Sequence, residues 1–347
     1  MHVRRPGRIG ARALTVAAAA GGAAAGIAIQ RHHLRALAHD EDYARLSSPL
    51  GGRGLTVTSA DGTTLYAEAF GPDHAQTLVL AHGWTEQLSF WGPVIRILSA
   101  QGLRLIAYDL RGHGRSGPAV GHDYALQRFG EDVEAVLAAT LGEGERATVV
   151  GHSLGAMSIA AWAEHHDVEL RARAAALVNT GLGDLIAGHL LFGELAKRLN
   201  NTWASRAFLG SRAPLPSFSS PLQHALIRYC AFGPAASTGD VAFYERMLIT
   251  CPPDVRAACG VAMSDMDLWH ALAKLTVPTL VVAGARDRLT PPAQATRIAG
   301  TLPHPAGLIE LPETGHMLPL ERPHELATAL SRLVAEPAAT PSVAAAK

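Results

Sequence analysis

Apolar residues recur along the chain in short uninterrupted runs, separated by longer segments with helical periodicity. Six runs are apolar on both faces, which is typical of strands buried in a parallel sheet; they cover residues 77–81, 103–108, 148–150, 175–178, 279–283 and 308–311. Between them, residues 91–100 and 129–141 carry apolar positions that place one apolar stripe on each predicted helix. This alternation predicts an α/β fold with a mostly parallel sheet and helices on both faces.

A different pattern opens the folded part of the chain. Residues 55–58 and 65–70 alternate apolar with polar positions and flank Asp61-Gly62, a strong turn signal. We therefore expect an antiparallel hairpin at the start of the sheet, which brings the predicted number of strands to eight.

One long interval interrupts the alternation of strands and helices. About ninety-five residues separate the run that ends at Val178 from the run that begins at Thr279. They contain no strand pattern but four helical ones, over residues 185–199, 222–232, 241–249 and 255–262. The prediction is a helical cap over residues 182–275, inserted between core segments 51–181 and 276–335.

The N-terminus has the pattern of an address segment. Arg4, Arg5, Arg8 and Arg12 precede an uncharged run from Ala13 to Ile29, and a membrane span needs roughly 17–25 such residues. The run is mostly Ala and Gly, which makes its insertion weak. We expect residues 1–50 to be a signal or membrane anchor with its linker, so that the protein is anchored or exported; a soluble tail on a cytoplasmic protein is the alternative. Residues 336–347 are predicted to be disordered.

Composition excludes several classes of partner. Lys and Arg number 30, as do Asp and Glu, so no overall field attracts nucleic acid. The cysteines Cys230, Cys251 and Cys259 form no CxxC pair, which argues against a zinc site and against a disulfide framework. Buried thiols are expected, although Cys251 and Cys259 are close enough to pair in an exported protein.

Polar, glycine-rich clusters follow the predicted strands. In a sheet of this kind, ligands bind at the carboxyl ends of the strands. The clusters at those ends are His82-Gly83-Trp84, residues 109–116, Gly151-His152-Ser153-Leu154-Gly155, Asp287 and residues 313–316. Function is therefore expected at this edge of the sheet.

The order of three residues in these clusters resembles one known family. Ser153 lies in GHSLG after the third parallel run, Asp287 comes late and His316 comes last, as in the α/β-hydrolase fold family. The motifs DLRGHGRS at 109–116, GARDRLTPP at 284–292 and GHMLPLERP at 315–323 match too. The resemblance covers about residues 54–335 and implies an eight-stranded α/β-hydrolase fold with a helical cap.

The chemistry explains why these residue types are needed. A serine hydroxyl is a poor nucleophile at neutral pH, so a base must take its proton. His316 is expected to be that base, and Asp287 to hold its other nitrogen and stabilise the imidazolium. Gly151 and Gly155 are expected to permit a sharp turn that strains Ser153.

The resemblance also implies an oxyanion hole. Its donors would be the backbone N–H groups of Trp84 and Leu154. His82 is expected to bond the loop backbone and His152 to serve in packing. Asp184 is a minor alternative to Asp287 for the acid.

Ser153 limits the reaction class. Relatives that open epoxides or displace halide use Asp in this place, so acyl transfer remains. We expect a carboxylesterase or lipase-like enzyme (EC 3.1.1) that cleaves a small-molecule ester with an apolar acyl or alcohol portion, without a metal or organic cofactor. The alternatives are a peptidase resembling proline iminopeptidases, a carbon–carbon bond hydrolase, a perhydrolase and an acyltransferase. A non-catalytic binding module is disfavoured because all three triad residues are present; the oligomeric state is left open.

Overall fold

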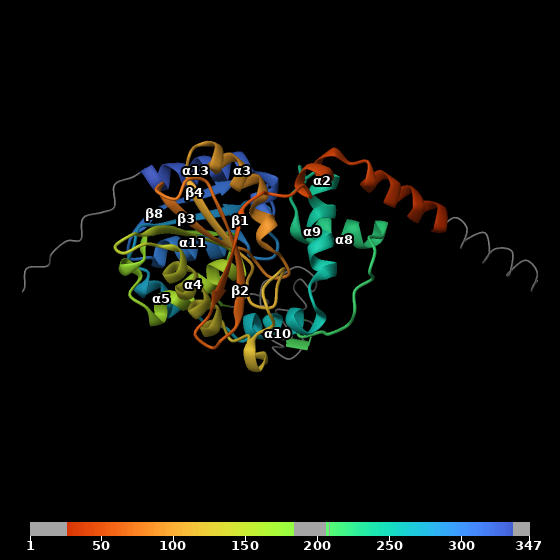
Figure 1. Ribbon diagram of the computed structural model, residues 1–347. Coiled ribbons are helices and arrows are strands. Elements are labelled where there is room, and N and C mark those ends of the chain that lie inside the picture. Colours follow the sequence, from red (N-terminus) through yellow and green to blue (C-terminus); the bar gives the residue numbers. More distant parts are fainter. Residues whose placement is uncertain (1–25, 184–205, 208, 336–347) are drawn as a thin grey trace, which may run out of the picture.

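A single eight-stranded sheet forms the centre of the protein (Figure 1). The computed structural model describes residues 26–183, 206–207 and 209–335. The strand order of the sheet is β1-β2-β4-β3-β5-β6-β7-β8. The strand β2 pairs antiparallel with both β1 and β4, and the strands β3 to β8 pair in parallel. The strands are β1 (Arg53–Thr58), β2 (Thr64–Phe70), β3 (Thr77–Ala81), β4 (Arg104–Tyr108), β5 (Ala147–His152), β6 (Ala172–Val178), β7 (Thr279–Gly284) and β8 (Pro305–Leu311). The predicted fold class is confirmed.

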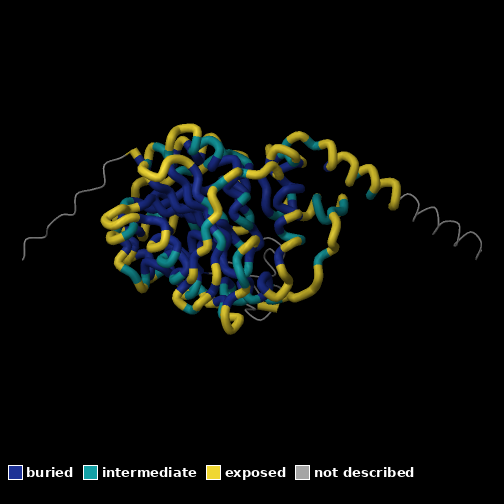
Figure 2. The backbone as a smooth tube through the Cα atoms, viewed as in Figure 1, coloured by how far each residue is buried: buried dark blue, intermediate teal, exposed yellow. Residues whose placement is uncertain are grey.

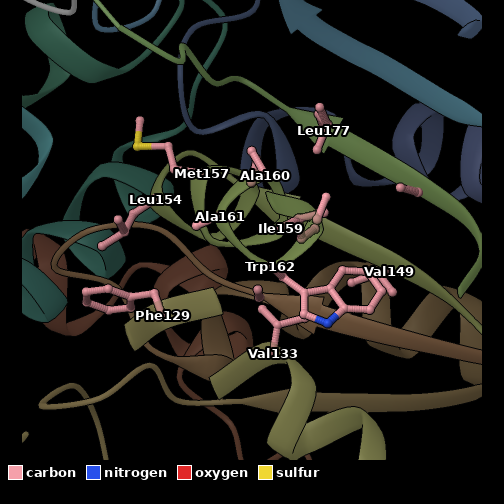
Figure 3. Packing of buried hydrophobic residues seen from close by; sticks show 14 of the residues in the cluster. Phe129, Val133, Val149, Leu154, Met157, Ile159, Ala160, Ala161, Trp162 and Leu177 are labelled. Atoms are coloured by element: carbon pink, nitrogen blue, oxygen red, sulfur yellow. The ribbon is translucent and has the colours of Figure 1, made fainter. Parts of the chain in front are cut away.

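Helices cover both faces of the sheet. On one face, α4 (Leu126–Thr140), α5 (Leu154–His165) and α11 (Pro292–Thr301) pack around Phe129 and Trp162, as Figure 3 shows for α4 and α5. On the other, α3 (Gly92–Ala100) and α13 (Pro323–Ala335) pack around Trp91. Figure 2 shows the sheet between them as buried chain. Short elements complete the core: η1 (Leu88–Trp91), η2 (Val120–His122), η3 (Val168–Leu170), η4 (Trp269–Lys274) and α12 (Leu318–Glu321).

One strand departs from the expectation of full burial. The run at 308–311 was expected to be buried on both faces, but β8 is the edge strand and pairs only with β7. Leu308 is 40 % exposed. A local apolar run identifies a strand, whereas the number of its neighbours depends on the whole sheet.

Three cap helices coincide with predicted helical segments. They are α8 (Pro221–Ala231), α9 (Thr238–Thr250) and α10 (Pro253–Ser264). Phe243 and Met247 of α9 pack with Phe232 and with Phe90 of the core, so the cap is joined to the core by an apolar cluster of its own. The fourth predicted segment, 185–199, lies outside the described residues.

The chain before β1 contacts the cap. A helix over residues 26–38 is followed by α2 (Glu41–Leu46), which packs on α9. Leu46 is only 2 % exposed and lies in the same cluster as Phe90. The segment proposed as signal or anchor, Ala13–Ile29, lies mostly outside the described residues, as does the tail 336–347. Within the described ranges, no helix is both long and apolar enough to cross a membrane.

The cysteines are unpaired in the structure. Cys251 and Cys259 are buried and Cys230 is half-buried. Burial raises the pKa of the Cys251 thiol to about 12, which keeps it protonated.

Candidate functional site

Ser153 sits on a strained turn between β5 and α5. Its backbone has φ 49° and ψ −115°, an unusual conformation for a residue other than glycine. Its N–H donates to the carbonyl of Val178 at 3.0 Å. A side chain at Gly155 would meet the Ala81 backbone, and one at Gly151 would meet the start of α5. The glycines are thus required by close packing, as the sequence predicted.

Asp287 and His316 meet beyond the ends of β7 and β8. Asp287 Oδ2 lies 2.8 Å from His316 Nδ1 and also accepts from Asn179 Nδ2 at 2.6 Å and from Thr290 Oγ1 at 2.7 Å. Asp287 Oδ1 accepts from the backbone N–H groups of Leu289 and Thr290. Burial alone would raise the pKa of the Asp287 carboxyl, but His316 and these donors hold it below its ordinary value. The carboxylate is therefore ionised and fixed.

The turn that carries Ser153 contacts this pair through His152. The rings of His152 and His316 have their centroids 4.8 Å apart and are tilted by 56°. Among the described residues, no hydrogen bond joins the Ser153 hydroxyl to His316. Such contacts are often long without a substrate and tighten in the complex. The structure thus brings the three predicted residues to one edge of the sheet, with the acid and base in direct contact.

The two predicted oxyanion donors lie at the start of α5 and after β3. Leu154 is the first residue of α5, where backbone N–H groups point outward and the helix dipole favours negative charge. Trp84 follows β3, and its indole N–H donates to the Arg256 carbonyl of α10 at 3.0 Å. In the part of the chain that the structure describes, neither backbone N–H donates to another group.

Two neighbouring loops support the Trp84 loop. His82 donates from Nδ1 to the Gly83 carbonyl and accepts at Nε2 from the Leu110 N–H, so it bonds the backbone as expected. Burial lowers its pKa well below the ordinary value. Asp109 accepts from the N–H groups of Leu88 and Arg115, and burial raises the pKa of its carboxyl to about 6.

Within residues 109–116, Arg111 is buried and forms ion pairs with Asp132 at 2.6 Å and with Asp61 at 2.8 Å. His113 Nε2 accepts from the Thr85 N–H. These contacts are structural and hold residues 109–116 against the Trp84 loop.

Asn179 and Thr290 were not identified from the sequence. Asn179 directly follows β6, has φ 46°, and donates to Asp287 and to the Gly315 carbonyl. Thr290 lies three residues after Asp287. The polar Asn179-Thr180 pair that directly follows an apolar run was the available signal.

A second buried pair, Glu86 and His152, connects the Trp84 loop, the Ser153 turn and the His316 loop. His152 Nδ1 lies 3.1 Å from the Glu86 carboxylate, and His152 Nε2 lies 2.8 Å from the His316 carbonyl. Glu86 also accepts from the Gly83 N–H. Both ring nitrogens of His152 therefore face acceptors, an arrangement that favours the doubly protonated imidazolium. Burial lowers the pKa of His152, but the charge and hydrogen bond of Glu86 outweigh burial and raise it overall.

Glu321 joins the His316 loop to the cap. Its carboxylate accepts from the Gly315 N–H at 3.0 Å and from the Gly233 N–H at 2.8 Å. The His316 N–H in turn donates to the carbonyl of Ala231, the last residue of α8. Burial raises the pKa of Glu321 to about 7 despite these donors. The position of the candidate base therefore depends on the cap.

Some expected features cannot be located. Asp184, the minor alternative for the acid, and the apolar residues 185–199 lie outside the described residues. Across the described ranges, no three His, Cys, Asp or Glu side chains are grouped to hold a metal ion.

Comparisons with known proteins agree with this architecture. The sequence model of the family described as alpha/beta hydrolase fold matches residues 76–323. The chain is 28 % identical over 272 residues to a non-heme haloperoxidase of Rhodococcus erythropolis, covering 75 % of this chain and 92 % of that one. It is 26 % identical over 278 residues to a bifunctional esterase/perhydrolase of Acinetobacter calcoaceticus, covering 76 % and 93 %. The solved esterase RhEst1 of Rhodococcus sp. ECU1013 superposes with a TM-score of 0.66 at 26 % identity, covering 81 % and 98 %.

Proposed function

Because this chain belongs to the alpha/beta hydrolase fold family, we propose that it is a serine hydrolase that cleaves small carboxylic esters through an acyl-enzyme. The observation that carries the proposal is the buried Asp287–His316 contact of 2.8 Å, at the same sheet edge as the strained Ser153 turn. No other serine of the described chain has a positive φ and is directly followed by the first residue of a helix.

The reaction proceeds in two halves. Ser153 Oγ attacks the ester carbonyl carbon while His316 Nε2 takes the hydroxyl proton, and Asp287 stabilises the imidazolium. The N–H groups of Trp84 and Leu154 bind the oxyanion, each donor contributing about 3 kcal/mol on the usual scale. The alcohol leaves with the proton from His316. Water, deprotonated by His316, then attacks the acyl-enzyme and releases the acid.

The cap favours an ester with an apolar portion over a peptide. A peptidase that recognises a free amino terminus needs carboxylates directed into the site. In the described cap, Asp240 caps α9, Glu245 bonds Ser219, and Asp265 pairs with Arg206. These acids are engaged elsewhere. Several apolar cap residues, including Phe232, Phe243 and Met263, pack in the apolar clusters that join the cap to the core.

Perhydrolysis is the second candidate. Two of the similar proteins are named as a haloperoxidase and as an esterase/perhydrolase. In that reaction hydrogen peroxide replaces water in the second half, and a peracid leaves instead of an acid. The same triad would perform it.

The location follows as a proposal from the sequence. The Arg-rich start and the uncharged run Ala13–Ile29 support a membrane anchor or an uncleaved signal.

A substrate panel tests the proposed reaction. We would measure kcat/KM for nitrophenyl esters of increasing acyl length, for prolyl and aminoacyl anilides and for diketones, each with and without hydrogen peroxide. The expected result is fastest turnover of an ester, and loss of that turnover in Ser153→Ala. Faster turnover of an anilide than of every ester would replace the esterase by the peptidase. Peracid formed faster than free acid would favour the second candidate.

A further inference from the structure

Exposed apolar side chains gather along one face of α8. Leu222, Leu226 and Tyr229 are 81 %, 52 % and 54 % exposed, and their spacing of four and three residues puts them on one side of the helix. Phe218, just before the helix, is 54 % exposed. Arg288, from the loop after β7, stacks on the Tyr229 ring with its guanidinium 4.4 Å from the ring centroid.

The helix over residues 26–38 extends this face. Gln30 Nε2 donates to the Ser219 carbonyl at 2.5 Å, His33 Nε2 lies 2.8 Å from Ser219 Oγ, and the rings of His33 and His224 lie 5.3 Å apart. The helix adds Ile27 and Ile29, 55 % and 59 % exposed. Figure 1 shows it with α8 at the end of the molecule where the N-terminus leaves. We call these residues of α8, Phe218 and the helix over residues 26–38 the outer cap face.

The same two parts of the chain lack acidic residues. Residues 1–39 contain six Arg, and residues 195–239 contain five Lys and Arg, but neither stretch contains Asp or Glu. The rest of the chain holds nineteen basic residues and all thirty acidic ones. The net charge of zero is therefore unevenly distributed along the sequence. Among the described residues, the contact of Gln30 and His33 with Ser219 joins the helix over residues 26–38, which carries Arg31 and Arg35, to the second stretch.

Among the described residues, an ion pair with Asp265 at 2.6 Å offsets the charge of Arg206, but no ion pair offsets Arg31 or Arg35. Arg31 and Arg35 are exposed on the helix over residues 26–38. Glu245, the acid that bonds Ser219, has a side chain only 1 % exposed and so presents no negative charge to a partner.

We propose that the outer cap face rests on the surface of an anionic phospholipid bilayer. Apolar side chains beside arginines are the composition of a surface that lies in the headgroup region, with the aliphatic groups inserted and the arginines against phosphates. The uncharged run Ala13–Ile29 leads directly into the helix over residues 26–38, so the proposed membrane segment ends on this face.

Charge favours a bilayer over a second copy of the chain. A symmetric dimer through this face would place the two basic stretches of one copy against those of the other. A nucleic acid would satisfy the arginines but leave Leu222, the most exposed of these side chains, in water.

The contact would adjoin the candidate site. Ala231, at the end of α8, accepts the His316 N–H at 2.8 Å, so the helix on the bilayer also holds the loop of the base. This inference extends the proposed membrane association and is independent of the reaction that the site performs.

Vesicle partition of the full chain tests the proposal. Sedimentation would be measured with phosphatidylcholine vesicles, with and without phosphatidylglycerol, for the wild type, Leu222→Asp and Leu170→Asp. Leu170 is the matched control, a 69 % exposed leucine in η3 of the core. We expect tighter binding with phosphatidylglycerol, about tenfold weaker partition for Leu222→Asp, and no change for Leu170→Asp. Turnover of a water-soluble nitrophenyl ester and circular dichroism would verify that the variants are folded.

Three results would overturn the proposal. The first is that the wild type does not bind anionic vesicles, and the second is that the two variants partition equally. The third is that Leu222→Asp changes the oligomeric state, measured by light scattering without vesicles, but leaves the partition into vesicles unchanged. The last result would assign the face to a second copy. Absence of ester hydrolysis would count against the proposed reaction, but the partition result could still be interpreted.

Discussion

At the scale of single residues, the hydrogen bonds around Asp287 determine what its amide analogue would do. In Asp287→Asn, the N–H groups of Leu289 and Thr290 need an oxygen where Oδ1 now lies. The new NH₂ must then face His316 Nδ1, which moves the imidazole proton to the nitrogen that should accept from Ser153.

We therefore expect kcat to fall by about 10³- to 10⁴-fold in Asp287→Asn. Asn179→Ala, which removes one donor to Asp287, should cost only about tenfold, the effect of one hydrogen bond. Steady-state kinetics with matched melting curves would measure both. A kcat for Asp287→Asn above one tenth of the wild-type value would contradict the assigned role.

The Glu86–His152 pair gives a prediction with a spectroscopic readout. At neutral pH, ¹⁵N NMR should find a proton on both ring nitrogens of His152. In Glu86→Gln the pair loses its charge with little change of shape, so His152 should keep one proton. Glu86→Ala leaves a buried imidazolium unpaired and should lower the free energy of unfolding by about 3–5 kcal/mol. A His152 with a single ring proton in the wild type would disprove the ion pair.

The sequence identified residues that lie in local motifs and missed those defined by tertiary contact. Ser153, Asp287 and His316 each follow a recognisable apolar run, so order and spacing were enough to propose them as a triad. Glu86 lies 66 positions from His152, and Asn179 lies 108 positions from Asp287. No local pattern records such a contact, which is why these partners emerged only in the structure.

At the scale of elements, Glu321 couples the His316 loop to the cap in a way that depends on pH. Burial raises the pKa of its carboxyl from 4.5 to about 7, so the folded chain binds more protons than the unfolded chain between these values. The free energy of unfolding should therefore fall as pH rises through this window, by at most about 1.4 kcal/mol per pH unit.

Glu321→Gln removes this titration. Denaturant unfolding at about pH 5 and about pH 8 should show that the wild type loses more stability than the variant as pH rises. Parallel losses in both proteins would contradict the assignment of the titration to Glu321.

The helix α2 belongs to the folded unit rather than to a linker. The sequence predicted a signal or membrane anchor with its linker over residues 1–50, but Leu46 is 2 % exposed between α9 and the core. Leu46→Ala should therefore lower the free energy of unfolding by about 2–4 kcal/mol. Leu34→Ala, at a position 41 % exposed, should change it by less than about 0.5 kcal/mol. Equal changes in the free energy of unfolding for the two variants would show that α2 is not part of the core.

Element types were predictable where the pattern was periodic, as for α4 or β3. The exposure of β8 and the docking of α2 were not, because each depends on which neighbours the completed sheet and cap provide.

At the scale of the whole molecule, the protein combines a mostly parallel sheet, a cap that contacts the His316 loop, and an uneven distribution of charge. The sheet was predictable from the hydrophobic pattern and the order of the motifs. The uneven distribution of charge could be interpreted only after the structure placed residues 26–38 beside Ser219. The total charge of the chain is zero and gave no indication of a charged surface.

The central claim is that His316 activates the Ser153 hydroxyl as the nucleophile. Covalent labelling with a fluorophosphonate, followed by peptide mass spectrometry, tests it most directly. Ser158→Ala is the matched control, because Ser158 lies one turn further along α5 and bonds only the Leu154 carbonyl. The account predicts a label on Ser153 in the wild type and in Ser158→Ala, none in Ser153→Ala, and labelling slowed by at least about 10³-fold in His316→Ala. A label on any other residue, or equal labelling of the wild type and Ser153→Ala, would contradict it.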